Sequence, residues 1–123
     1  MKTTYRLFVA ALATGALGGA LAAGDPVRGK ALYQERCAAC HSPDYNGTGP
    51  AHRGVFGRHA ASAPGFAYSK ALRESGITWD EASLDRWLTD PERDVPGEAM
   101  GISVPDAEDR ADVIAFLKTL TAR

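Results

Sequence analysis

CAACH, residues 37 to 41, contains both cysteines of the chain and a histidine directly behind them. Two cysteines at this spacing can form a redox-active disulfide, supply half of a zinc site, or attach another molecule covalently. The histidine and the rest of the sequence indicate which of these three uses applies.

The first two uses find little support in the sequence. A structural zinc site needs four ligands, and two cysteines with three histidines are the whole supply of such ligands. His52 and His59 stand in a polar loop rather than at the spacing typical of zinc ligands. A thioredoxin-like dithiol needs strand–helix–strand surroundings, and we find no alternating strand pattern of useful length.

The third use is the attachment of a c-type haem. Each thiol then adds to one vinyl group of the haem, and His41 directs a ring nitrogen at the iron from one face. Only this interpretation uses the histidine, so the motif predicts one covalent haem c, attached through Cys37 and Cys40 with His41 as a metal ligand.

The start of the chain is typical of a secretory signal peptide. Two basic residues, Lys2 and Arg6, precede an uncharged run of 17 residues from Leu7 to Ala23, and Ala20-Leu21-Ala22 has the pattern of a cleavage site. An uncleaved membrane anchor is the alternative, but the run is marginal for a span. We expect a cleaved signal peptide at 1–22, a domain at 23–123 and a periplasmic location.

Composition limits what the mature domain can do. Cleavage after residue 22 of 123 leaves 101 residues, and the loss of two of the 14 basic residues leaves 12 against 15 acidic ones, a formal charge of −3. Such a charge argues against nucleic acid as a partner. A domain this small often needs a cofactor, metal or disulfide to be stable.

Helical signals dominate the mature chain and predict an all-α fold with about four helices and two long loops. The helices are expected at 26–38, 68–73, from a capping box at Thr78–Glu81 to Asp90, and at 106–121. The loops are expected at 42–65 and 90–105, where Pro and Gly are frequent. Loops this long in a small domain usually enclose a ligand or carry function.

Apolar spacing predicts which face of each main helix is buried. In the first helix we expect Val27, Ala31 and Leu32 on the apolar side, and in the third Leu84, Trp87 and Leu88. The last helix has a single apolar stripe, which consists of Val113, Ile114, Leu117 and Leu120 and is widened by Phe116.

Met100 is the only methionine of the mature chain, and it lies in the second loop. A haem iron in an electron carrier needs a second axial ligand, and a thioether favours ferrous iron and raises the potential. The alternative is that Met100 fills a gap in the core, but its loop position favours the ligand. His52 and His59 are the fallback ligands, and otherwise ordinary solvent-facing residues.

The ordered series of segments in the mature chain resembles the class I cytochromes c of the mitochondrial and bacterial cytochrome c2 type. The similarity is carried by GDPVRGKALYQERCAACH, GTGPAHRGVFGR, APGFAYSKALRESGITW, LDRWLTDPERDVPGEAM and DRADVIAFLKTL. It covers nearly everything after the signal and implies a small all-α fold wrapped around one haem. CxxCH alone indicates only a c-type haem, whereas the series is more specific.

The resemblance also implies residue roles. The thioether positions are Cys37 and Cys40, and the axial ligands are His41 and Met100. The carbonyl of Pro50 is expected to accept the other ring N–H of His41. Further positions match family residues that hydrogen-bond a buried haem propionate, namely Arg58, Tyr68 and Trp79. Gly29 and Phe116 match the close crossing of the first and last helices.

A few positions depart from the family pattern. Trp87 stands where a tyrosine often hydrogen-bonds the methionine sulfur, and Glu98 and Ala99 replace a common Thr-Lys pair before the methionine. Leu72 replaces a common asparagine near the haem. These changes leave the expected ligands in place but affect the potential and the docking surface.

The function that the resemblance implies is that of a soluble single-haem electron carrier and not an enzyme. Its partners would be redox proteins that dock transiently at the haem edge: a bc1-type donor, and an oxidase, reductase or reaction centre as acceptor. The alternatives are a haem subunit fixed in a larger oxidoreductase complex, or a haem peroxidase or ligand sensor in which Met100 is labile. The stretch 90–98 contains four acids and one base, which indicates a partner that is not itself acidic.

Overall fold

The computed structural model describes residues 23–123, so the signal peptide predicted at 1–22 lies outside the described residues. The helices within this range are α1 (Pro26–Arg36), α2 (Lys70–Glu74), α3 (Glu81–Thr89), α4 (Pro91–Asp94) and α5 (Ala107–Thr119). The described residues contain no strand, only an isolated antiparallel bridge between His59 and Thr78. The all-α prediction is therefore confirmed.

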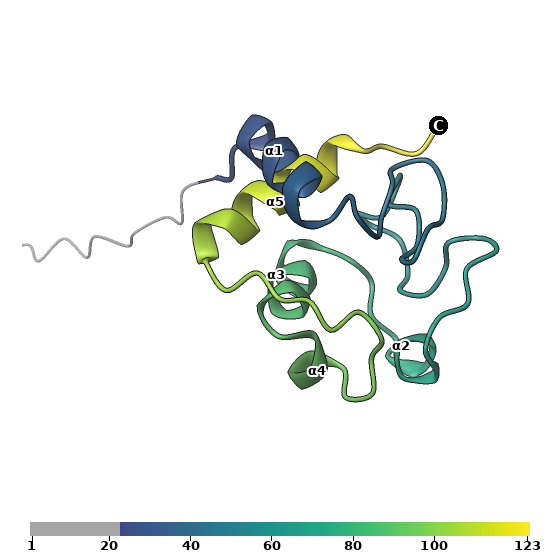
Figure 1. Ribbon diagram of the computed structural model, residues 1–123. Helices are drawn as coiled ribbons and strands as arrows, with labels where there is room; N and C mark the ends of the chain where they lie inside the picture. The colour runs from purple at the N-terminus through teal and green to yellow at the C-terminus, as the bar shows by residue number, and fades with distance from the viewer. Residues whose placement is uncertain (1–22) are drawn as a thin grey trace, which may run out of the picture.

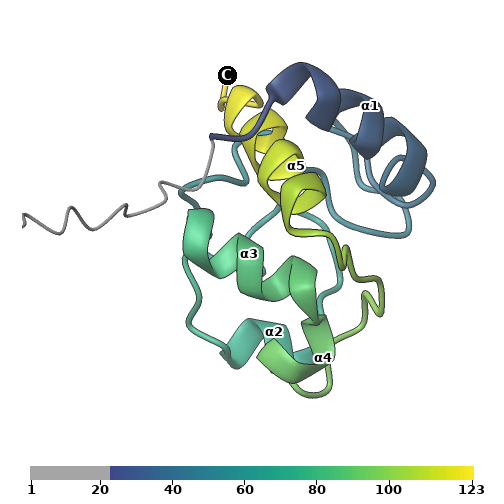
Figure 2. The ribbon, with the colours of Figure 1, turned by 90° about the vertical axis from the view of Figure 1, so that its left-hand side faces the viewer.

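Helices α1 and α5, from opposite ends of the described chain, pack across each other (Figures 1 and 2). The Asp25 side chain caps α1 by accepting from the Val27 N–H at 2.8 Å. A Cβ atom built at Gly29 would lie 1.9 Å from the Asp112 carbonyl oxygen and 3.0 Å from the Phe116 Cβ. The predicted close crossing at Gly29 and Phe116 is confirmed.

The predicted apolar face of α1 is only partly confirmed. Leu32 is half-buried and packs against the core, but Val27 is 78% exposed and Ala31 is also exposed. The residues of α1 that are buried are Gly29 and Tyr33. The closeness of α5 explains the difference, because the face that meets α5 needs a residue without a side chain rather than the most apolar one. Residues 29 and 33 are one helical turn apart and so share that face.

Helix α3 begins two residues later than the sequence signals predict. Its N-cap is Asp80, whose carboxylate accepts from the Ser83 N–H at 2.8 Å while the Ser83 hydroxyl accepts from the Asp80 N–H at 2.8 Å. Thr78, the expected cap, instead bonds the His59 ring through its hydroxyl at 3.0 Å. The capping box exists, but it consists of Asp80 and Ser83.

Two smaller predictions also need correction. The short helix expected at 68–73 is α2, and it begins after Ser69, whose hydroxyl accepts from the Leu72 N–H. The loop expected at 90–105 opens with the one-turn helix α4. Asp90 ends α3 and caps α4, and Pro91 suits a first helical position because it has no N–H to satisfy.

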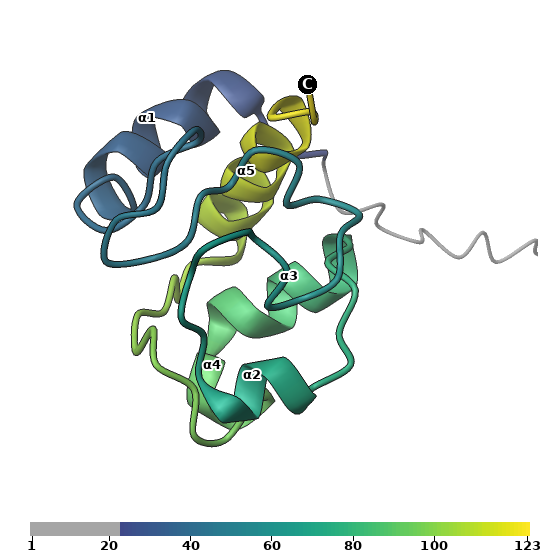
Figure 3. The ribbon, with the colours of Figure 1, turned by 90° about the vertical axis from the view of Figure 1, so that its right-hand side faces the viewer.

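Buried side chains of α3 and α5 lie in one core, as their apolar spacing predicts. Tyr33 of α1 and residues from the loops complete it. The core consists of Tyr33, Val55, Trp79, Leu84, Trp87, Leu88, Val95, Val104, Val113, Ile114, Phe116, Leu117 and Leu120. Figure 3 shows how the loop between α1 and α2 and the loop between α4 and α5 connect the crossed helices to the α2–α4 end. The long loops therefore contribute to the core as well as connecting helices.

Replacing Gly29 with alanine should destabilise the protein by about 1–3 kcal/mol, the usual range for overpacking. The new methyl group has backbone on its far side, so α1 and α5 have to move apart. Urea unfolding measures the loss. Lys30→Ala, at the next and exposed position of α1, is the control and should change stability by less than about 0.5 kcal/mol. Equal stabilities for the two variants would contradict the tight crossing.

Candidate functional site

A cavity of about 300 Å³ lies between the end of α1, the two long loops, α3 and α5. Its lining is mostly apolar. Every site residue predicted from the sequence lines it: Cys37, Cys40, His41, Pro50, Arg58, Tyr68, Trp79 and Met100. The fold thus brings together residues from four separate stretches of the chain.

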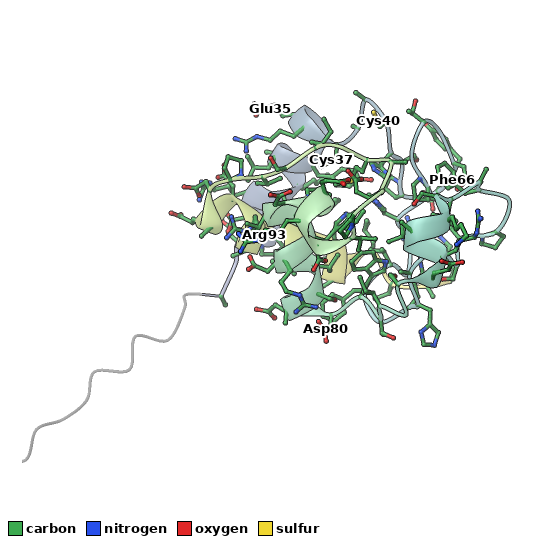
Figure 4. The ribbon with its side chains drawn as sticks, turned by 90° about the horizontal axis from the view of Figure 1, so that it is seen from below. Glu35, Cys37, Cys40, Phe66, Asp80 and Arg93 are labelled. Atoms are coloured by element: carbon green, nitrogen blue, oxygen red, sulfur yellow. The ribbon has the colours of Figure 1, made fainter. Side chains whose placement is uncertain are left out.

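The two cysteines lie in a turn that continues directly from α1. The Cys37 carbonyl accepts from the Cys40 N–H at 3.0 Å and from the His41 N–H at 2.9 Å, which folds the motif back on itself. Both thiols are free, and they follow α1 at the cavity wall (Figure 4). Burial raises the pKa of the Cys37 thiol to about 11. A reactive dithiol needs a lowered pKa, so this environment does not favour redox disulfide chemistry.

His41 is oriented by its surroundings. Its Nδ1 lies 2.8 Å from the Pro50 carbonyl oxygen, and since a carbonyl can only accept, Nδ1 carries the hydrogen. Burial lowers the pKa of His41 and outweighs the opposing effect of this bond. The ring is therefore neutral at neutral pH, and Nε2 has a free lone pair, which is the form that binds a metal.

Gly49 allows the chain to approach this imidazole. A Cβ atom at residue 49 would lie 2.2 Å from His41 Cε1 and 2.6 Å from both ring nitrogens. These distances describe a point above the ring face, not beyond its edge. Any side chain at position 49 would displace the histidine, which explains the glycine before Pro50.

His52 is not the solvent-facing loop residue expected from the sequence. It is half-buried, its ring stacks on that of His41 with centroids 4.0 Å apart, and its Nδ1 lies 2.9 Å from the Tyr33 hydroxyl. Burial, with smaller contributions from His41 and Arg58, lowers the pKa of His52 to about 3, so its ring is neutral. His59 is exposed, as expected, and bonds Thr78.

Met100 is half-buried and lines the same cavity from the loop between α4 and α5. The buried Trp87 also lines it and packs against Trp79, with ring centroids 5.5 Å apart. The structure thus places a thioether, an imidazole and two thiols around one apolar space, although the methionine is far from the motif in sequence.

The three residues expected to face a propionate also line the cavity, but the side-chain hydrogen bonds of Arg58 and Tyr68 are to the backbone. Arg58 donates to the Ala51 carbonyl at 2.7 Å and to the Arg53 carbonyl at 3.1 Å. The Tyr68 hydroxyl accepts from the Ala63 N–H at 3.0 Å. Trp79 is 6% exposed and belongs to the core. A guanidinium has five N–H groups, so Arg58 retains donors for a carboxylate.

The residues present fit a covalently bound haem. The cavity provides an apolar environment for the ring, two free thiols at its wall and a histidine with an unprotonated nitrogen. Within residues 23–123 no three side chains of the His, Cys, Asp and Glu types cluster as metal ligands do. In the same range no helix has the length and apolar character needed to cross a membrane.

Sequence reasoning missed several apolar residues of the cavity wall, chiefly Val55, Phe66 and Val113. Val113 was recognisable as part of the buried stripe of α5, but periodicity does not show what a buried face meets. Phe66 lies on the loop before α2 (Figure 4), and no local pattern in a loop indicates such contact.

Comparison with known proteins gives consistent matches. The sequence model of the family described as Cytochrome c matches residues 26–121. A cytochrome c2 of Rhodomicrobium vannielii is 47% identical over 104 residues, which cover 81% of this chain and 82% of that protein. A cytochrome c of Euglena viridis is 43% identical over 79% of this chain and 98% of its own. Among solved structures, cytochrome cH from Methylobacterium extorquens has a TM-score of 0.75 at 44% identity, covering 78% of this chain and 99% of that one.

Proposed function

The chain belongs to the cytochrome c family and carries covalent haem c, and from this premise we propose that it is a soluble periplasmic shuttle between redox complexes. It takes one electron from a bc1-type donor and passes it to an oxidase, a reductase or a reaction centre. The protein is an electron carrier and not an enzyme. The single observation that supports the proposal most is the convergence of CAACH and Met100 on one apolar cavity.

We assign the attachment points to Cys37 and Cys40, and the axial ligands to His41 and Met100. When bound, the haem supplies the one-electron change at iron. Ligation by both His41 and Met100 would leave no position on the metal for oxygen or peroxide. The Pro50 carbonyl holds the His41 ring in one orientation through the 2.8 Å bond.

Arg58, Tyr68 and Trp79 are assigned to the haem propionate. A carboxylate buried without donors is costly. Arg58 and Tyr68 both line the cavity, and their side chains carry N–H and O–H groups. The Trp79 indole N–H would be a third donor. The signal peptide at 1–22 and the mature domain at 23–123 complete the proposal, since a c-type haem and a thiol pair suit an exported protein.

A redox titration of the purified protein, followed by optical absorption, tests this function. We expect a single one-electron transition, a low-spin six-coordinate spectrum, and slow binding of carbon monoxide because both axial positions are occupied. Rapid carbon monoxide binding or peroxide turnover would instead indicate a sensor or a peroxidase. Gel filtration of a native extract distinguishes a free carrier from a subunit fixed in a larger complex.

A further inference from the structure

Two carboxylates, Glu92 of α4 and Glu98 of the loop itself, bond the backbone of the loop that presents Met100. Within the described residues, the Gly97 N–H donates to both oxygens of Glu92 at 3.1 Å, and the Met100 and Gly101 N–H groups donate to Glu98. A loop between helices has no regular pattern of backbone hydrogen bonds that pairs its N–H groups. These bonds to carboxylates therefore help to order the loop.

Glu98 lies where it can act on Met100 directly. Its carboxylate accepts from the N–H of Met100 itself, and from that of Gly101 at 2.9 and 3.1 Å. Its own N–H donates to the Val95 carbonyl at 3.1 Å. Val95 is 6% exposed and belongs to the core, so Glu98 links the backbone at Met100 to a rigid point of the fold.

The conformation of Gly101 supports this arrangement. Its φ is +63°, in the left-handed region, yet a Cβ atom there would have no neighbour within 4 Å. The glycine is therefore needed for its backbone angles and not for space. A left-handed residue in such a turn directs successive N–H groups to one point, which forms a concave site for an anion. Here the anion is the Glu98 carboxylate.

We propose that Glu98 is a positioning residue for Met100: by binding the N–H groups of residues 100 and 101, its carboxylate holds the loop in the form that keeps the methionine sulfur on the iron. The inference rests on the proposed ligation by Met100. Loss of the carboxylate frees two N–H groups at the point where the ligand is attached, so the sulfur leaves the iron more often.

Displacement of the methionine by added imidazole in the oxidised protein tests this role. The loss of the weak far-red iron–sulfur band gives the rate, and amide hydrogen exchange at Met100 and Gly101 reports on the loop. In Glu98→Ala we expect both rates to rise by about tenfold or more, since a bond to a charged group contributes at least that factor to an equilibrium. Glu98→Gln keeps an acceptor oxygen without the charge and should fall between Glu98→Ala and the unmodified protein.

Glu92→Ala is the matched control. It removes the same charge and a similar carboxylate–backbone bond from the same loop, but three residues before Met100. We expect it to leave imidazole displacement within about twofold, less than one ordinary hydrogen bond. If Glu92→Ala and Glu98→Ala accelerate displacement equally, or neither does, the positioning role is wrong. A far-red band absent from the unmodified protein would overturn the Met100 ligation, and this inference with it.

Discussion

Haem-free protein in which Cys37 and Cys40 are both replaced by alanine should be largely unfolded by circular dichroism. In the proposed arrangement the haem would fill the apolar cavity around which both long loops fold, and without it the Val55 and Val104 side chains would lose part of their packing surface. Ordering ten loop residues costs about 10–20 kcal/mol in backbone entropy. That cost is comparable to or larger than the net stability of about 5–15 kcal/mol typical of a domain, so we expect the loss of the haem contacts to unfold the protein.

The unmodified protein should retain one haem after acid–acetone extraction, seen by mass spectrometry, whereas the double variant should lose it. Ala38→Ser, which changes the motif but keeps both thiols and lies at an exposed position, is the control and should retain its haem and fold. A native helical signal with a cooperative melt in the haem-free double variant would refute the dependence on haem. Complete extraction of haem from the unmodified protein would refute the covalent attachment.

Met100→Ala should open the iron site, remove the far-red iron–sulfur band and lower the potential. The thioether favours ferrous iron, so the fall should be a substantial part of the range of about 0.8 V over which axial ligands set haem potentials. Redox titration and the absorption spectrum measure both effects, and carbon monoxide should then bind quickly.

Ile102→Ala is the matched control for this variant. Ile102 lines the same cavity two residues later and is 54% exposed, but it has no atom able to bind iron. It should keep the band and shift the potential only slightly. An unchanged band in Met100→Ala would refute ligation of the iron by Met100.

The acidic side chains of the stretch 90–98 have structural roles in addition to their charge. Asp90 caps α4, Glu92 and Glu98 bind backbone N–H groups, and Asp94 pairs with Arg86 at 3.4 Å. The expectation that the partner protein is not itself acidic stays a prediction. Charge reversal at Glu92 or Glu98 would change the loop as well as the docking surface, so it does not test docking alone.

Much of the site was predictable because its signals are local. The chemistry of CAACH follows from five consecutive residues, and the residues of each apolar stripe in α3 and α5 lie within a few turns of one another. Met100 was identified as the only mature methionine in a loop. In each case the interacting groups are near one another in the sequence, or the mature chain has only one residue of the required type.

Other features depended on partners that are distant in sequence. Thr78 forms a bridge with His59, and the N-cap of α3 is therefore Asp80 rather than Thr78. The buried face of α1 is set by the approach of α5, and the burial of His52 by its stacking on His41. Local patterns in the chain were enough to predict the groups that would hold the haem and to locate the main helices. Which faces and loops meet became visible only in the folded molecule, because those contacts form between residues that no local pattern relates.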